Sequence, residues 1–159
     1  MKNRKPLPAI ALIAGGSGDR ELLSVRAASL LDQAEVVVCD PEATALITGA
    51  DVEVLDLPTA PTDALTVAKA LIEHARTGQH VVRIFAGDPV SDGRVFAEAK
   101  ALHRAKVPFE ILPTAADVVG VAAYTGINLV GHKAKHLRVV DLLTSEVDTE
   151  ALADATSTL

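Results

Sequence analysis

The segment 86–89, of sequence Ala-Gly-Asp-Pro, combines residue types that suit a ligand-binding turn. It follows the apolar run Val81–Phe85, which has the composition of a buried strand. Gly87 has no Cβ, so a ligand can approach its backbone closely, and Pro89 stiffens the turn. Open α/β sheets bind ligands in crevices at the carboxyl ends of their strands. The segment therefore predicts a ligand site; the alternative is a plain turn in which Asp88 caps the next helix.

A second candidate is the glycine-rich segment 15–19, Gly-Gly-Ser-Gly-Asp, which follows the apolar stretch 8–14. Glycine loops after a first strand often hold a phosphate at a helix N-terminus. The spacing here matches neither G-x-G-x-x-G nor a P-loop, so a dinucleotide site with Asp40 on the ribose is a minor alternative. From its position alone, directly before Pro41, Asp40 only ends a strand.

The composition favours one compact domain of ordinary size. The chain has 159 residues, of which 49% are apolar, and this argues against disorder. The formal net charge of −6 argues against binding nucleic acid through bulk charge. The single cysteine, Cys39, excludes an internal disulfide framework and a thiolate-rich zinc site, and it fits a reducing, cytoplasmic compartment. We expect no metal centre, no transmembrane segment and no signal peptide.

Short apolar runs alternate with stretches of helical spacing along most of the chain. We expect strands at 8–14, 36–39, 52–57, 80–85 and 108–112, and helices at 22–31, 42–47, 64–76, 93–106 and 115–124. The helix at 93–106 is expected to bury Val95, Phe96, Ala99 and Leu102 on one face. This order of elements predicts an α/β fold with a mostly parallel five-stranded sheet flanked by helices.

The character of the chain changes after residue 128. A cluster of basic residues consists of His132, Lys133, Lys135, His136 and Arg138. It is either a substrate-binding cluster or a solvated loop between domains. A sixth strand is expected at 137–142 and a helix start at 148–150. We therefore predict a domain at 1–130, followed at 131–159 by a linker and the beginning of a truncated second domain.

Five separated segments, all in register, resemble motifs of the tetrapyrrole methylase family. Segment 13–27 resembles V-G-x-G-P-G-D-P-x-L-L-T-x-x-A, segment 36–40 resembles V-V-x-Y-D, and segment 82–94 resembles V-R-L-K-G-G-D-P-F-x-F-G-R. Segments 109–113 and 122–129 resemble E-V-V-P-G-x-T-S and A-Y-A-G-I-P-L. The resemblance covers residues 8–132, and it is greatest to the uroporphyrinogen-III C-methyltransferases of the family.

This resemblance implies two α/β domains with S-adenosylmethionine bound between them, of which the chain holds the first. By motif position, it implies that Asp40 accepts a proton and that Arg94 lies near the tetrapyrrole. The positions that correspond to the family's cofactor-binding residues are Ser17, Ala86, Gly87, Asp88, Ser91, Ala116 and Asp117. Without the resemblance, Asp117 is equally a helix-terminus carboxylate.

The sequence departs from the family pattern at several of these positions. Ser17 replaces the loop proline, Ala86 replaces the first glycine of the pair before Asp88, and Ala116 replaces a threonine. If the position of Ala86 requires a positive φ, the alanine is strained there. No lysine corresponds to the family's proposed proton donor. These departures bear on cofactor affinity and turnover more than on the fold.

The resemblance implies one activity and leaves two alternatives open. The activity is the S-adenosylmethionine-dependent C-methylation of uroporphyrinogen III to precorrin-2, on the sirohaem and cobalamin branch, with little activity expected from these 159 residues alone. One alternative is a degenerate, non-catalytic module fused to uroporphyrinogen-III synthase. The other is a precorrin methyltransferase with a different target carbon. A homodimer that buries an exposed apolar face is also expected.

Overall fold

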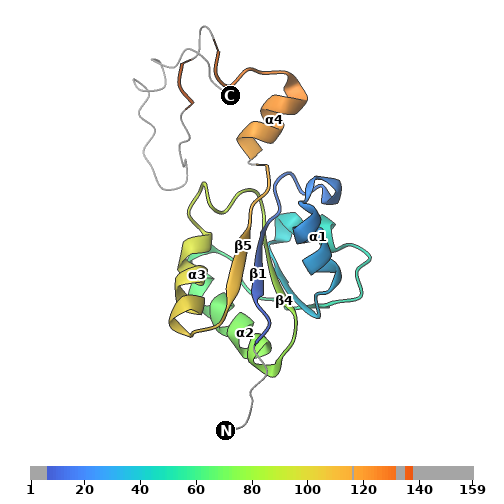
Figure 1. Ribbon diagram of the computed structural model, residues 1–159, viewed down its shortest axis with the longest axis vertical. Coiled ribbons are helices and arrows are strands. Elements are labelled where there is room, and N and C mark those ends of the chain that lie inside the picture. The colour runs from blue at the N-terminus through green and yellow to red at the C-terminus, as the bar shows by residue number, and fades with distance from the viewer. Residues whose placement is uncertain (1–6, 116, 132–134, 138–159) are drawn as a thin grey trace. The chain divides into compact units, whose positions relative to one another are not determined.

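Figure 1 shows the computed structural model of the chain, which describes residues 7–115, 117–131 and 135–137. The chain divides into two compact units, Met1–Ala115 and Ala116–Leu159. The predicted domain at 131–159 stays a prediction, because most of that stretch lies outside the described residues.

The first unit is built on a fully parallel sheet of five strands in the order β3-β2-β4-β1-β5. The strands are β1 (Ile10–Ala14), β2 (Val36–Cys39), β3 (Glu53–Val54), β4 (Val81–Phe85) and β5 (Phe109–Leu112). β4 is the central strand, and every residue of β4 and β1 is buried, as expected for parallel strands covered on both faces. The predicted α/β fold with a parallel five-stranded sheet is confirmed.

Helices cover both faces of this sheet (Figure 1). The helices α2 (Ala64–Thr77) and α3 (Val95–Arg104) pack against one face. On the other face pack α1 (Val25–Asp32) and the 3₁₀ helix η2 (Pro41–Ile47). Because side chains alternate along a strand, β4 contributes to the apolar clusters of both faces. The apolar core is therefore split into two clusters by the sheet.

Local signals in the sequence set several element boundaries. The Ser24 hydroxyl accepts the backbone N–H of Ala27 at 3.2 Å and so caps α1. The helix predicted at 42–47 forms as η2, a 3₁₀ helix with Pro41 in its first turn. The strand predicted at 52–57 is reduced to β3, because only Glu53 and Val54 pair with β2 in the sheet.

The face predicted for α3 is wrong at one position. Phe96 is 54% exposed, whereas Glu98 is only 3% exposed and shares the buried face with Val95, Ala99 and Leu102. A buried carboxylate requires a partner, and Glu98 pairs with Arg83 of β4. Hydropathy alone places the aromatic residue inside, and the ion pair decides the orientation instead.

In the second unit, the structure describes the helix α4 (Asp117–Thr125), close to the helix predicted at 115–124. Residues 138–142 of the predicted sixth strand and the predicted helix start at 148–150 lie outside the described residues, as do His132, Lys133 and Arg138 of the basic cluster. Within the described ranges, no helix combines the length and the apolar character that crossing a membrane requires.

Candidate functional site

The loops that follow β1 and β4 are joined by backbone hydrogen bonds. The N–H of Gly15 donates to the carbonyl of Phe85 at 2.8 Å, and the N–H of Gly16 donates to the carbonyl of Gly87 at 3.0 Å. The N–H of Gly18 donates to the carbonyl of Gly15 at 3.0 Å. Since these three amides are engaged within the protein, they do not form the open phosphate cradle of a dinucleotide loop.

Glycine is required in this loop because other backbone and side-chain atoms approach it closely. A Cβ at Gly15 would lie 2.5 Å from the carbonyl oxygen of Phe85, closer than real Cβ atoms come. Gly16 has a φ of +54°, and a Cβ there would lie 2.9 Å from Cγ2 of Thr114. Thr114 follows β5, so the loops after β1, β4 and β5 meet at the carboxyl edge of the sheet.

Asp40 brings the end of β2 to the same edge, and the residue is 2% exposed. Its Oδ2 accepts the backbone N–H of Ala86 at 2.9 Å and lies 2.9 Å from Nη1 of Arg94. Its Oδ1 lies 2.6 Å from Nη2 of Arg83, but off the hydrogen-bonding direction. Within the described part of the chain, Oδ1 is thus a buried oxygen in an ion pair that accepts no hydrogen bond.

Arg94 links Asp40 to the turn after β4. Its Nη2 donates to the carbonyl oxygen of Ala86, and its Nε lies 2.6 Å from Oδ2 of Asp92. Burial works against the charged guanidinium, but Asp92 and Asp40 outweigh it, so the pKa of Arg94 is raised and the group stays cationic. The two residues predicted as catalytic, Asp40 and Arg94, are therefore in direct contact.

The turn itself is held by Asp88. The Ser91 hydroxyl donates to Oδ2 of Asp88 at 2.5 Å, and the N–H of Val90 donates to Oδ1 at 3.1 Å. The residue at the N-cap of α3 is Arg94, so the alternative in which Asp88 caps the next helix is wrong. Asp88 closes the turn before that helix begins.

The positive φ in this turn falls on Gly87, at 66°. Among the described residues, Lys106 is the non-glycine residue with a positive φ, so the strain considered for Ala86 does not arise. Ala86 packs against the apolar cluster on the α1 face of the sheet. The alanine is therefore accommodated by the core beside the turn.

The structure brings six of the nine predicted site residues together around one turn: Asp40, Ala86, Gly87, Asp88, Ser91 and Arg94. Ser17 is exposed in the neighbouring glycine loop. Ala116 lies outside the described residues, and Asp117 is the first residue of α4 in the second unit. The roles of all nine stay predictions.

Two buried charged residues beside the site were not predicted. Arg83 is 1% exposed, and its Nε lies 3.2 Å from Oε1 of Glu98. Each breaks an apolar pattern, since Arg83 stands inside the run Val81–Phe85 and Glu98 stands on the buried face of α3. Burial raises the pKa of Glu98, although Arg83 acts in the opposite direction.

Cys39 lies directly before Asp40 at the end of β2. Burial, together with the neighbouring Asp40 carboxylate, raises the pKa of its thiol to about 11. The thiol is therefore protonated at neutral pH, and Cys39 is not an activated nucleophile.

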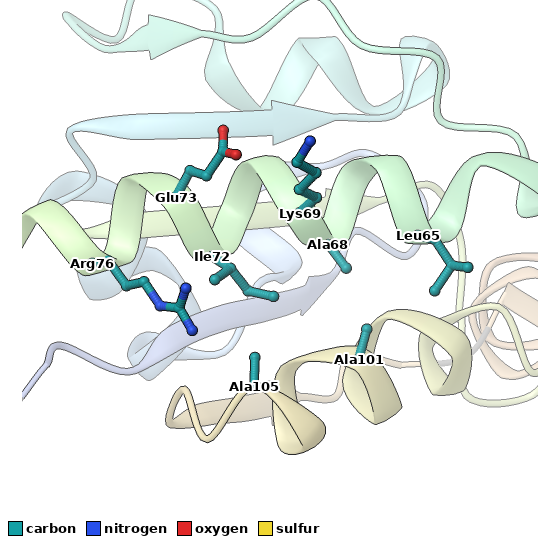
Figure 2. A pocket seen from close by; sticks show the side chains of 8 residues that line it. All are labelled: Leu65, Ala68, Lys69, Ile72, Glu73, Arg76, Ala101 and Ala105. Atoms are coloured by element: carbon teal, nitrogen blue, oxygen red, sulfur yellow. The ribbon is translucent and has the colours of Figure 1, made fainter.

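A groove of about 300 Å³ lies between α2 and α3, apart from this site. In Figure 2, Leu65, Ala68 and Ile72 of α2 point toward Ala101 and Ala105 of α3. The charged residues in its lining are Lys69, Glu73 and Arg76. None of these residues belongs to the loops at the carboxyl edge of the sheet, so the groove is separate from the candidate site.

The chain belongs to the tetrapyrrole (corrin/porphyrin) methylase family, whose model matches residues 9–159. The resemblance seen in the sequence is therefore confirmed. A curated relative, the siroheme synthase of Nitrosomonas europaea, is 32% identical over 136 residues, which cover 78% of this chain and 28% of that protein. The chain thus spans less than a third of the length of this relative.

Solved structures show the same fold. The uroporphyrin-III C-methyltransferase of Thermus thermophilus, complexed with S-adenosyl homocysteine, is 30% identical with a TM-score of 0.66, and the match covers 81% of this chain and 53% of that one. A cobalt precorrin-4 methyltransferase, a cobalamin biosynthetic enzyme, is 29% identical with a TM-score of 0.69, covering 79% and 54%. The chain matches about half of each structure.

Proposed function

We propose that this chain is part of an S-adenosylmethionine-dependent methyltransferase that methylates a carbon of uroporphyrinogen III to give precorrin-2. The observation that supports it most is the meeting of the loops after β1, β2, β4 and β5 at one edge of the sheet, in a chain of the tetrapyrrole methylase family. The Thermus relative was solved with S-adenosyl homocysteine, the product form of the cofactor, which adds support for this ligand.

The residues at this edge fit a cationic cofactor. S-adenosylmethionine carries a sulfonium and an ammonium group, and two carboxylates meet the turn: Asp40 accepts the N–H of Ala86, and Asp88 accepts the N–H of Val90. Asp40 is already paired with Arg83 and Arg94, so in our proposal Asp88 supplies the charge that attracts the cofactor.

When bound, S-adenosylmethionine supplies an electrophilic methyl group. In our proposal Gly87, Asp88 and Ser91 hold the cofactor from the turn after β4, and Ser17 does so from the glycine loop. Ala116 and Asp117 are included in the proposal by their motif positions alone. Rigid placement of the reacting carbon against the methyl group provides most of the acceleration.

Asp40 is proposed to act as the general base. Transfer of a methyl cation leaves the pyrrole positively charged, so the methylated pyrrole must lose a proton, and in our proposal the carboxylate of Asp40 accepts it. Arg94 is proposed to attract the carboxylates of the tetrapyrrole, since its guanidinium is partly exposed beside Asp40.

Isothermal titration of the full-length protein with S-adenosyl homocysteine tests the cofactor assignment. We expect saturable binding, and no detectable heat at millimolar ligand would refute the proposal. Replacing Asp40→Asn keeps an acceptor for the N–H of Ala86 but removes the base. Methyl transfer to uroporphyrinogen III should then fall by about 10²–10⁴-fold.

A precorrin methyltransferase with another target carbon is a second candidate, and the likeness to the cobalt precorrin-4 methyltransferase favours it. Mass spectrometry of the products formed from several tetrapyrroles distinguishes the two activities. Methylation of a precorrin but not of uroporphyrinogen III would select the second candidate.

A non-catalytic module, fused to uroporphyrinogen-III synthase, is a third candidate. The contacts of Arg94 favour it, because this side chain already engages Asp40 and the carbonyl of Ala86. Turnover that appears only after Ala86→Gly would support this candidate, and robust methylation by the unmodified protein would dismiss it.

We also propose that the full-length protein is a homodimer. Light scattering of the full-length protein tests this oligomeric state.

A further inference from the structure

We infer that Arg83 and Glu98 are positioning residues, which act through Asp40 to hold the turn at 86–89 in place. The inference rests on the proposed function, because that function assigns the turn its role in binding the cofactor. The contacts that carry it all lie within the first unit, on β2, β4 and α3.

Arg83 is held on every side of its guanidinium. Its Nε lies 3.2 and 3.3 Å from the two carboxylate oxygens of Glu98, and its Nη1 donates to the carbonyl of Ile84 at 2.6 Å. Its Nη2 lies 2.6 Å from Asp40, and its Cζ lies 4.1 Å from the ring centroid of Phe85. A planar guanidinium with these contacts has a single orientation.

Asp40 contacts both Arg83 and the turn, so it connects the two. The Oδ1 of its carboxylate is paired with Arg83, and its Oδ2 accepts the N–H of Ala86. A continuous series of contacts therefore runs from Glu98 in α3 through Arg83 and Asp40 to the first residue of the turn. Because all three charged groups are buried, leaving any of them without its partner is costly, and this keeps the series intact.

Amide hydrogen exchange at Ala86 measures whether this series holds the turn. In Glu98→Leu, Nε of Arg83 loses its acceptor, so the guanidinium and Asp40 are free to reorient. We expect the exchange of the Ala86 amide to speed up by at least about tenfold, while the amides of β4 keep their protection. Glu98→Gln still offers a carbonyl oxygen to Nε and should preserve the protection of Ala86.

Exposed Glu73 on α2 provides matched controls, because Glu73→Leu and Glu73→Gln make the same chemical changes outside the series. Equal exchange of Ala86 in Glu98→Leu and Glu73→Leu would overturn the inference. If Glu98→Leu loses protection throughout the first unit, Arg83→Lys decides instead, since lysine keeps the charge without the planar fork. Faster exchange confined to the turn then supports the inference, and unchanged exchange at Ala86 refutes it.

Titration of the same variants with S-adenosyl homocysteine separates this inference from the proposed function. Glu98→Leu should bind this ligand at least about tenfold more weakly than Glu98→Gln does. Absence of binding in the unmodified protein would remove the proposed function, while the exchange result at Ala86 would still decide the positioning role.

Discussion

The two faces of strand β4 have interiors of opposite kinds. Toward α1, Val82 and Ile84 join a cluster made of apolar side chains. Toward α3, Val81 and Phe85 flank Arg83, a fully buried cation. An apolar interior requires only shape and volume, whereas a buried charge requires partners in defined directions. The face with the charge is also the face connected to the candidate site.

The largest expected effect comes from removing that charge. Arg83→Ala leaves the carboxylates of Asp40 and Glu98 buried, with Arg94 as the cation closest to Asp40. Breaking a buried ion pair by removing one partner costs about 3–5 kcal/mol, and we expect a loss of this size in the free energy of unfolding measured with urea. Arg76→Ala, on the exposed face of α2, is the control. A loss no larger than that of the control would contradict the contrast between the two faces.

On the opposite face of β4, a small truncation should cost less. Ile84→Val removes one methylene from a fully buried side chain in the apolar cluster. We expect the free energy of unfolding to fall by about 0.5–1.5 kcal/mol, because the cluster can partly close around the gap. If urea unfolding shows a loss equal to that of Arg83→Ala, the two faces are energetically alike and the comparison fails.

The pH dependence of stability also tests the contrast between the two faces of β4. Burial raises the pKa of Glu98 above its ordinary value of 4.5, so protonation of this carboxyl favours the folded state. This contribution of Glu98 to the stability of the folded state is complete below pH 4.5 and is lost as the pH rises through the raised pKa. Glu98→Gln cannot titrate. We therefore expect the wild type to lose stability relative to Glu98→Gln as the pH rises above 4.5, as urea midpoints would show. A difference independent of pH would contradict the raised pKa.

The smallest expected effect concerns an ion pair at the surface. Both carboxylate oxygens of Glu110 in β5 lie 2.7 Å from nitrogens of Arg26 in α1. Arg26 is solvent-exposed, so water and salt screen this pair in a way that they do not screen Arg83. We expect Arg26→Gln to leave the urea midpoint unchanged within error. A clear loss would mean that surface and buried pairs contribute alike.

Much of the fold was predictable from the sequence, because the signals that specify it are local. The run Val36–Cys39 was predicted as a strand with the bounds that it has, and the helix predicted at 64–76 forms as α2. Parallel strands end at the same edge of a sheet, so the order of the elements places Asp40 and the 86–89 turn at one edge. The neighbouring positions of β2 and β4 within the sheet were not predicted. Phe96 was misplaced, because hydropathy does not reveal that an ion pair turns Glu98 inward.

By itself, the sequence determined the alternation of strands and helices, the parallel sheet and the family, since these depend on periodicity and on motifs spanning a few residues. Only the tertiary structure decided which polar groups meet. Arg83 and Glu98 each interrupt an apolar pattern, and neither interruption identifies the other residue as its partner. That pairing depends on how α3 lies over β4, and the bond from Asp40 to Ala86 joins residues 46 positions apart. Packing of the whole unit sets such contacts, and no local preference of the chain encodes them.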